Sequence, residues 1–159
     1  MSKSNILFII NPISGGKKKA RIPQLIDTYL DKSKYNANFS FTDTGENALH
    51  YTISKASEMS ERTEIVKVLI AAGTDVNKKT IPGKSTLCFM RDAYLKGETP
   101  LHRAAAYANV TIVKMLLDAG ADRSLKDANG DTPISWGSWH LRDTDILQLL
   151  VYEGVASVW

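Results

Sequence analysis

The stretch Gly97-Glu-Thr-Pro-Leu-His102 decides the fold, because two similar stretches occur elsewhere in the chain. One is Gly45-Glu-Asn-Ala-Leu-His50, and the other is Gly130-Asp-Thr-Pro-Ile-Ser135. The last two copies begin 33 residues apart, which is the period of a unit made of a β-turn and two antiparallel helices. The repeat therefore predicts a stack of helix pairs, and such stacks present extended surfaces that suit binding more than catalysis.

Each copy carries signals for the start and the end of its helices. Thr99 and Thr132 are good helix-capping residues, and the proline that follows each is tolerated at a first helical position, where its missing N–H has no partner in any case. Apolar residues then recur at helical spacing, and glycines such as Gly120 end the second helix. The pattern predicts about three helix-pair repeats, at residues 44–77, 97–129 and 130–155.

On these residues the chain resembles the ankyrin repeat family over about residues 44–155. The resemblance implies a mostly α-helical fold, a short ankyrin-repeat solenoid. It also implies a non-enzymatic scaffold that binds a protein or peptide on a concave face, which the turn tips and the first helix of each pair form.

Residues 78–96 interrupt the repeat. The first two copies begin 52 residues apart, which leaves 19 residues beyond one period, about five inside the first helix pair and 14 between Asn77 and Gly97. We expect residues 78–96 to be an insertion. Inserted loops in repeat arrays gather on one face and sometimes bind partners, and tolerated padding is the alternative.

Residues 1–43 follow a different pattern. The apolar run Ile6–Ile10 predicts a strand, Asn11–Gly16 a turn, residues 17–34 a helix and residues 38–42 a second strand. This N-terminal β-α-β segment, with its motif Asn-Pro-Ile-Ser-Gly-Gly, resembles the start of the catalytic domain of diacylglycerol kinases and related bacterial lipid kinases. The resemblance covers about a quarter of the chain.

The lipid-kinase resemblance supplies an alternative function, nucleotide or phosphate binding. Small residues would let backbone amides approach phosphate oxygens, and the following helix and lysines would add positive charge. The residues concerned are Asn11, Ser14, Gly15, Gly16 and Lys17. ATP with Mg²⁺ is a cofactor only under this alternative; the main interpretation has no cofactor.

Kinase activity is not expected from this chain. The second signature of the kinase family, Gly-Gly-Asp-Gly-Thr, is absent from the sequence, and 43 residues cannot supply a full catalytic domain. We therefore assign no catalytic residues. The abrupt change between residues 42 and 45 also leaves open a chimera, engineered or recombined, without a selected partner.

Composition narrows the classes of protein to which the chain can belong. The sequence is 43% hydrophobic, and it has no run near the roughly 20 apolar residues that a membrane span requires. A single cysteine, Cys88, excludes an internal disulfide and favours a reducing, cytoplasmic location. Residues 1–43 carry a net charge of +4 and the rest −1. Since the basic residues form no extended stripe with aromatic residues between them, the pattern does not favour nucleic acid.

The histidines do not have the spacing of metal ligands. His50 and His102 occupy the same repeat position, 52 residues apart, with no cysteine or other histidine nearby. In ankyrin proteins the imidazole at this position typically hydrogen-bonds within the turn network, which the resemblance implies here. We expect structural histidines and no metal site.

Alignment of the three copies places candidate contact residues in rows on the concave face. Aromatic and arginine side chains contribute most to interfaces, because they bury a large area at a small entropic cost. The predicted partner-binding residues are Tyr51, Lys55, Arg103, Tyr107, Trp136, Trp139 and His140. As an alternative, Trp136 or Trp139 covers the end of the stack. Unpaired edges of the N-terminal strands also make self-association an expectation.

Overall fold

A computed structural model describes residues 4–10, 35–41, 44–54, 59–86 and 94–152 of the chain. These residues form two strands and three pairs of helices. The elements are β1 (Ser4–Ile10), β2 (Tyr35–Phe41), α2 (Ala48–Ser54), α3 (Met59–Ala71), α4 (Pro100–Tyr107), α5 (Val110–Asp118), α6 (Pro133–Trp139) and α7 (Thr144–Leu150).

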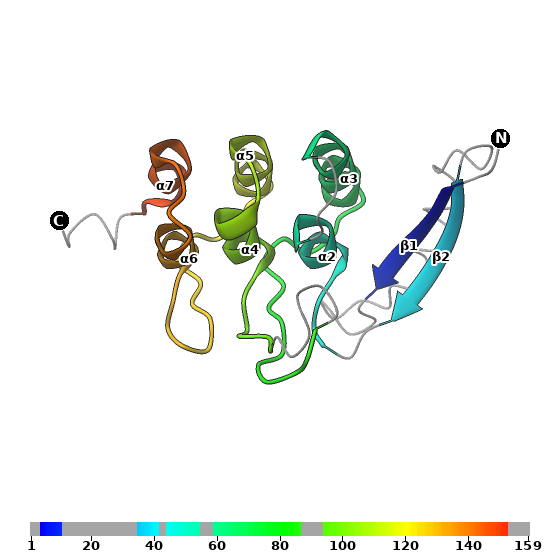
Figure 1. Cartoon of the computed structure of the whole chain (residues 1–159), viewed down its shortest axis with the longest axis horizontal. Coiled ribbons are helices and arrows are strands. Elements are labelled where there is room, and N and C mark those ends of the chain that lie inside the picture. Colours follow the sequence, from blue (N-terminus) through cyan, green and yellow to red (C-terminus); the bar gives the residue numbers. More distant parts are fainter. Residues whose placement is uncertain (1–3, 11–34, 42–43, 55–58, 87–93, 153–159) are drawn as a thin grey trace.

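The six helices form two layers. Figure 1 shows α2, α4 and α6 side by side in one row, with α3, α5 and α7 in a second row above them. The loops that precede α4 and α6 project to the side away from the second row, and we call this the loop side. The mostly helical repeat fold expected from the sequence is therefore confirmed.

The core lies between the two rows of helices. Its fully buried members include Leu49, Leu101, Ile112, Leu116 and Ile146. Removing such side chains from water is the main stabilising term of a fold of this kind. Between α4 and α6 the packing depends on small residues: a Cβ added at Gly137 would lie 3.0 Å from Leu147 Cδ2 and 3.6 Å from the Ala105 carbonyl oxygen.

The N-terminal strands β1 and β2 pair in parallel, with Ser4 opposite Tyr35 and Ile10 opposite Phe41. They lie at the end of the stack formed by the first helix pair, where β1 contacts α2. The helix expected at residues 17–34 lies outside the described residues, as does Cys88. The β-α-β segment as a whole therefore stays a prediction.

The expected insertion joins a ladder of loop backbones. Within it, the Gly83 N–H donates to the Leu95 carbonyl and the Leu95 N–H to the Lys84 carbonyl, both at 2.9 Å. The Thr80 N–H donates to the Glu98 carbonyl at 3.0 Å, and the Ala128 N–H donates to the Lys96 carbonyl at 2.7 Å. The loop before α4 is thus bonded to the loop before α6.

The capping interpretation of the Thr-Pro pairs needs a correction. The helices α4 and α6 do begin at Pro100 and Pro133. Thr99 forms a capping box with His102, in which its side chain accepts from the His102 backbone N–H and its own N–H donates to His102 Nδ1 at 3.1 Å. Thr132 makes no side-chain cap bond, and at this residue the expectation is wrong.

An arginine that the sequence did not single out joins the last two repeats. The Arg142 guanidinium donates to the Ala106 carbonyl at 2.6 Å and also to the Ala108 carbonyl. These are carbonyls at the C-terminal end of α4, where no helical N–H remains to bond them. A cation at this end also interacts favourably with the helix dipole.

Gly45 provides a test of the loop packing. Its φ is +79°, and an added Cβ would lie 2.9 Å from the Ile81 nitrogen, whose N–H donates to the Thr44 carbonyl at 2.8 Å. We expect Gly45→Ala to lower the free energy of unfolding by about 2 kcal/mol or more, since backbone strain and a backbone clash add. Urea unfolding measures the change.

Gly73→Ala is the matched control for this variant. Gly73 has a φ of +78° with nothing within 4 Å of an added Cβ. Only the left-handed backbone conformation should therefore lower the free energy of unfolding, by roughly 1 kcal/mol. Equal losses in the two variants would contradict the packing described at Gly45.

Candidate protein-binding surface

Arg103, which we expected on the surface, is completely buried, and that expectation is wrong. Its guanidinium lies between the first two repeats. Nη2 is 2.7 Å from Glu46 Oε1 and 2.6 Å from Glu98 Oε1. Nη1 donates to the His50 carbonyl and to the Ser54 hydroxyl, both at 3.1 Å. A side chain at this repeat position faces the preceding repeat and not the solvent.

The insertion completes this buried cluster. The Thr86 hydroxyl donates to Glu46 Oε1 and the Thr80 hydroxyl to Glu98 Oε2, each at 2.8 Å. Burial opposes ionisation of Glu98, but the charge and hydrogen bonds of Arg103, together with backbone amides, outweigh it and lower the pKa of Glu98. The described residues of the insertion, 78–86 and 94–96, therefore contribute to the structure that joins the first two repeats.

Trp136 aligns with Arg103 in the next copy of the repeat and is also buried, with 7% of its surface exposed. Its indole N–H donates to Asp127 Oδ2 at 3.1 Å. Its ring meets the His102 ring edge to face, with 5.6 Å between centroids. The sequence left two interpretations open for Trp136, contact with a partner or cover for the end of the stack. The structure shows the ring packed within the stack, on the preceding repeat and not at the end.

The two aligned histidines bond successive repeats. His50 Nε2 lies 3.2 Å from the Glu98 carbonyl oxygen, and His102 Nε2 lies 3.0 Å from the Asp131 carbonyl oxygen. The backbone N–H groups of Asn47 and Thr99 point to the other ring nitrogens. Burial lowers the pKa of both imidazoles, most strongly for His50. Both histidines therefore have the structural role that we expected.

The exposed members of the predicted set gather where α4 and α6 end. Trp139 has 59% of its surface exposed and Tyr107 has 36%. The Tyr107 and His140 rings meet edge to face, with centroids 4.9 Å apart. Lys96, which we did not predict, places Nζ 5.6 Å from the ring of Trp136 and 6.0 Å from that of Trp139. We call Lys96, Tyr107, Trp139 and His140 the aromatic surface.

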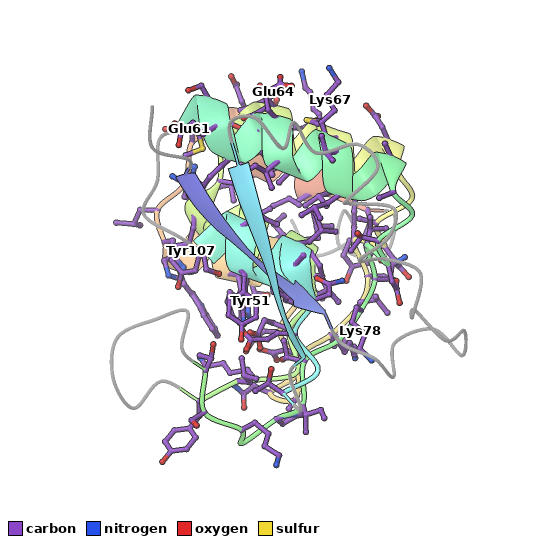
Figure 2. The ribbon with its side chains drawn as sticks, turned by 90° about the vertical axis from the view of Figure 1, so that its right-hand side faces the viewer. Tyr51, Glu61, Glu64, Lys67, Lys78 and Tyr107 are labelled. Atoms are coloured by element: carbon purple, nitrogen blue, oxygen red, sulfur yellow. The ribbon has the colours of Figure 1, made fainter. Side chains whose placement is uncertain are left out.

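Tyr51 and Lys55 stand apart from this group. Tyr51 is half-buried in α2, and Figure 2 shows it and Tyr107 on the part of the inner helices that faces the loops. Lys55 lies outside the described residues, and so do all five predicted phosphate contacts, Asn11, Ser14, Gly15, Gly16 and Lys17.

Among the described residues, no group of three or more histidine, cysteine, aspartate or glutamate side chains is placed to hold a metal ion. In the same part of the chain, none of the helices has the length and apolar character needed to cross a membrane.

Stacked helix pairs with loops on one side define a helical repeat protein, in which each unit contacts only its neighbours. The model of the ankyrin repeat matches residues 44–81, and a model of ankyrin repeats in many copies matches residues 91–135. Together the two matches cover just over half of the chain. The chain therefore belongs to the ankyrin repeat family, whose repeats are a protein–protein interaction module.

Similar proteins come from several sources. An ankyrin repeat protein of Acanthamoeba polyphaga mimivirus is 32% identical over 80 residues, which are 50% of this chain and 9% of that protein. The intracellular phospholipase A2 of Caenorhabditis elegans is 32% identical over 111 residues, 69% of this chain and 9% of the enzyme. A fowlpox virus ankyrin repeat protein is 34% identical over 105 residues, 65% and 21% of the respective chains. The chain thus spans about a fifth or less of each relative.

Proposed function

We propose that this chain binds a protein or peptide through the aromatic surface, without catalysis. The observation that carries the proposal is the exposure of Trp139. A tryptophan with 59% of its surface in solvent lies 6.0 Å from the ammonium group of Lys96. The next residue in the chain, His140, packs on the ring of Tyr107 at the end of the neighbouring inner helix.

Two properties of the surface support binding. Tryptophan and tyrosine contribute most to interfaces, because rigid rings bury much area with little loss of entropy. The surface is also held in place from below: Trp136 is fixed by Asp127, and Arg142 bonds the end of α4 to the loop after α6. A preformed surface loses less conformational freedom when a partner binds.

Trp139→Ala tests this proposal. Twelve-residue peptides would be selected from a random display library on the folded protein, and their dissociation constants measured by fluorescence anisotropy. We expect Trp139→Ala to weaken the selected peptides by about 30-fold, the roughly 2 kcal/mol of an interface hot spot. The free energy of unfolding should change by less than about 0.5 kcal/mol, as for other exposed positions.

Val68→Ala is the control for the display experiment. Val68 lies on α3, in the other row of helices, with 60% of its surface exposed, and its loss should leave the affinity unchanged. Selected peptides that bind Trp139→Ala as well as the wild-type protein would place the binding site elsewhere.

The other sequence-based interpretations remain proposals. The lipid-kinase resemblance and the nucleotide site rest on the motif at residues 11–16, and the family matches begin at residue 44. Self-association through β1 and β2, a chimeric origin and a cytoplasmic location likewise rest on the sequence. The lipase activity named for the worm relative belongs to a protein of which this chain covers 9%, so we do not extend it to this chain.

A further inference from the structure

Four lysines lie on neighbouring loops of the loop side, and one of them, Lys96, also belongs to the aromatic surface. Lys78 and Lys79 belong to the loop before α4, and Lys79 Nζ donates to the Lys126 carbonyl in the next loop at 2.5 Å. The Ala128 N–H donates to the Lys96 carbonyl at 2.7 Å. Lys79, Lys96 and Lys126 therefore stand on adjacent stretches of backbone, and all three are exposed. We call Lys78, Lys79, Lys96 and Lys126 the lysine cluster.

Acidic groups near the lysine cluster are already engaged. Glu46 and Glu98 bond to Arg103 inside the fold, and Asp127 accepts from the Trp136 indole. Among the described residues, the ion pairs found are both made by Arg103. Three carboxylates remain in these loops. Asp75 accepts from the Asn77 N–H and the exposed Asp122 from Ser124, and Asp131 is half-buried. Among the described residues, none of these three carboxylates forms an ion pair with the lysine cluster, so its exposed ammonium groups remain open to an anionic partner.

The outer row of helices, α3, α5 and α7, exposes mainly negative charge. Exposed carboxylates outnumber exposed lysines there, and Figure 2 shows Glu61 and Glu64 projecting from α3 away from the loops, while Lys78 lies lower, with the loops. The exposed acidic residues on the outer helices are Glu61, Glu64, Asp118 and Asp145. Charge of opposite sign on the two sides would orient an anionic partner toward the lysine cluster.

From this arrangement we propose that the partner is an acidic peptide segment with a large apolar side chain. Its carboxylates would contact the lysine cluster, and its apolar side chain would pack on Trp139. Lys96 belongs to both groups of residues, since its ammonium lies near the Trp136 and Trp139 rings. The inference rests on the function proposed above and names the chemistry of its partner. A peptide fits both surfaces at once, whereas a phosphate backbone by itself would use only the lysines.

The test uses fluorescein-labelled probes and the full chain. The first probe is a twelve-residue peptide of alternating aspartate and glutamate with one central phenylalanine. The others replace phenylalanine by serine, or all acidic residues by lysine, and the last is a twelve-nucleotide oligothymidine. We expect the first peptide to bind most tightly, with an affinity that falls as NaCl is raised, because salt screens exposed charges.

The Lys96→Glu, Lys126→Glu double variant tests the role of the lysine cluster. We expect it to weaken the first peptide by about tenfold or more, because it places like charges against the partner. The control is Lys67→Glu, Lys114→Glu, which changes the net charge equally with exposed lysines of α3 and α5, and should leave most of the affinity. Circular dichroism and urea unfolding establish that both variants fold.

Three outcomes would overturn the inference. They are equal weakening in the two double variants, tighter binding of oligothymidine than of the acidic peptide, and no preference for phenylalanine over serine. If display-selected peptides depend on Trp139 but not on the lysines, the proposed function stands and the acidic partner is rejected. If the acidic peptide binds Trp139→Ala unchanged, the aromatic surface itself is rejected.

Discussion

Arg103→Met is expected to lower the free energy of unfolding by about 3–5 kcal/mol, although a methionine fills a similar space. The substitution leaves the carboxylates of Glu46 and Glu98 buried and without their cation, and breaking a buried ion cluster in this way costs far more than the cluster contributes when intact. Urea unfolding followed by circular dichroism measures the loss of stability. A variant that does not fold agrees with the expectation, because it has lost more stability than the wild-type protein possesses.

Two further variants separate charge from packing at this site. Arg103→Met combined with Glu46→Gln and Glu98→Gln removes every charge of the cluster, and should recover most of the stability. Arg123→Met is the matched control, since Arg123 is half-buried and donates one bond, from Nε to the Leu149 carbonyl at 2.7 Å. We expect it to cost about 1–2 kcal/mol. A triple variant no more stable than Arg103→Met would reject the role of the buried charge.

The second large effect is a loss of stability on acidification, through His50 and His102. Burial lowers the pKa of both imidazoles in the folded state. As the pH falls below about 6.5, the unfolded chain takes up protons that the folded chain does not. Stability present above that pH is therefore lost below it, with a slope that approaches about 2.7 kcal/mol per pH unit for two protons. Urea unfolding between pH 7.5 and 5 measures the slope.

Nuclear magnetic resonance tests the cause directly. In the folded protein, the ring protons of His50 and His102 should keep the chemical shifts of neutral imidazole at pH 6.5, and His50 should remain neutral to a lower pH than His102. Titration of either ring near pH 6.5 in the native state would contradict the assignment, whatever the slope of stability. His102→Gln, which removes one of the two titrating groups, should roughly halve that slope.

Much of the fold could be predicted because ankyrin repeats carry local signals. The glycine that opens each copy has a positive φ, +79° at Gly45 and Gly97 and +89° at Gly130, a conformation that few other residues adopt easily. The role of His50 and His102 followed from their equal register. Features of this kind depend on a few neighbouring residues, so a single sequence displays them.

The contact surface was predicted only in part, for a physical reason. Alignment of the three copies predicts Tyr51, Arg103 and Trp136 on the concave face, whereas Arg103 is buried because Glu46, Glu98 and two threonines of the insertion meet around it. Such a set converges only in three dimensions. Lys96 was missed for the same reason, since the hydrogen bonds between loops bring it to Trp139. The sequence does show that Glu46 and Glu98 share one repeat position, but it does not show that one arginine bonds both carboxylates.

The hydrogen bond from Thr86 to Glu46 has a consequence for folding kinetics. It joins positions 40 residues apart, so the first helix pair completes its contacts only after the chain as far as Thr86 has closed back on it. Repeat proteins usually gain stability one unit at a time, through neighbours that form local contacts, and distant contacts slow folding. In this chain the first two repeats should therefore form and open as one cooperative unit, with the amides of α2 and α4 exchanging their hydrogens together.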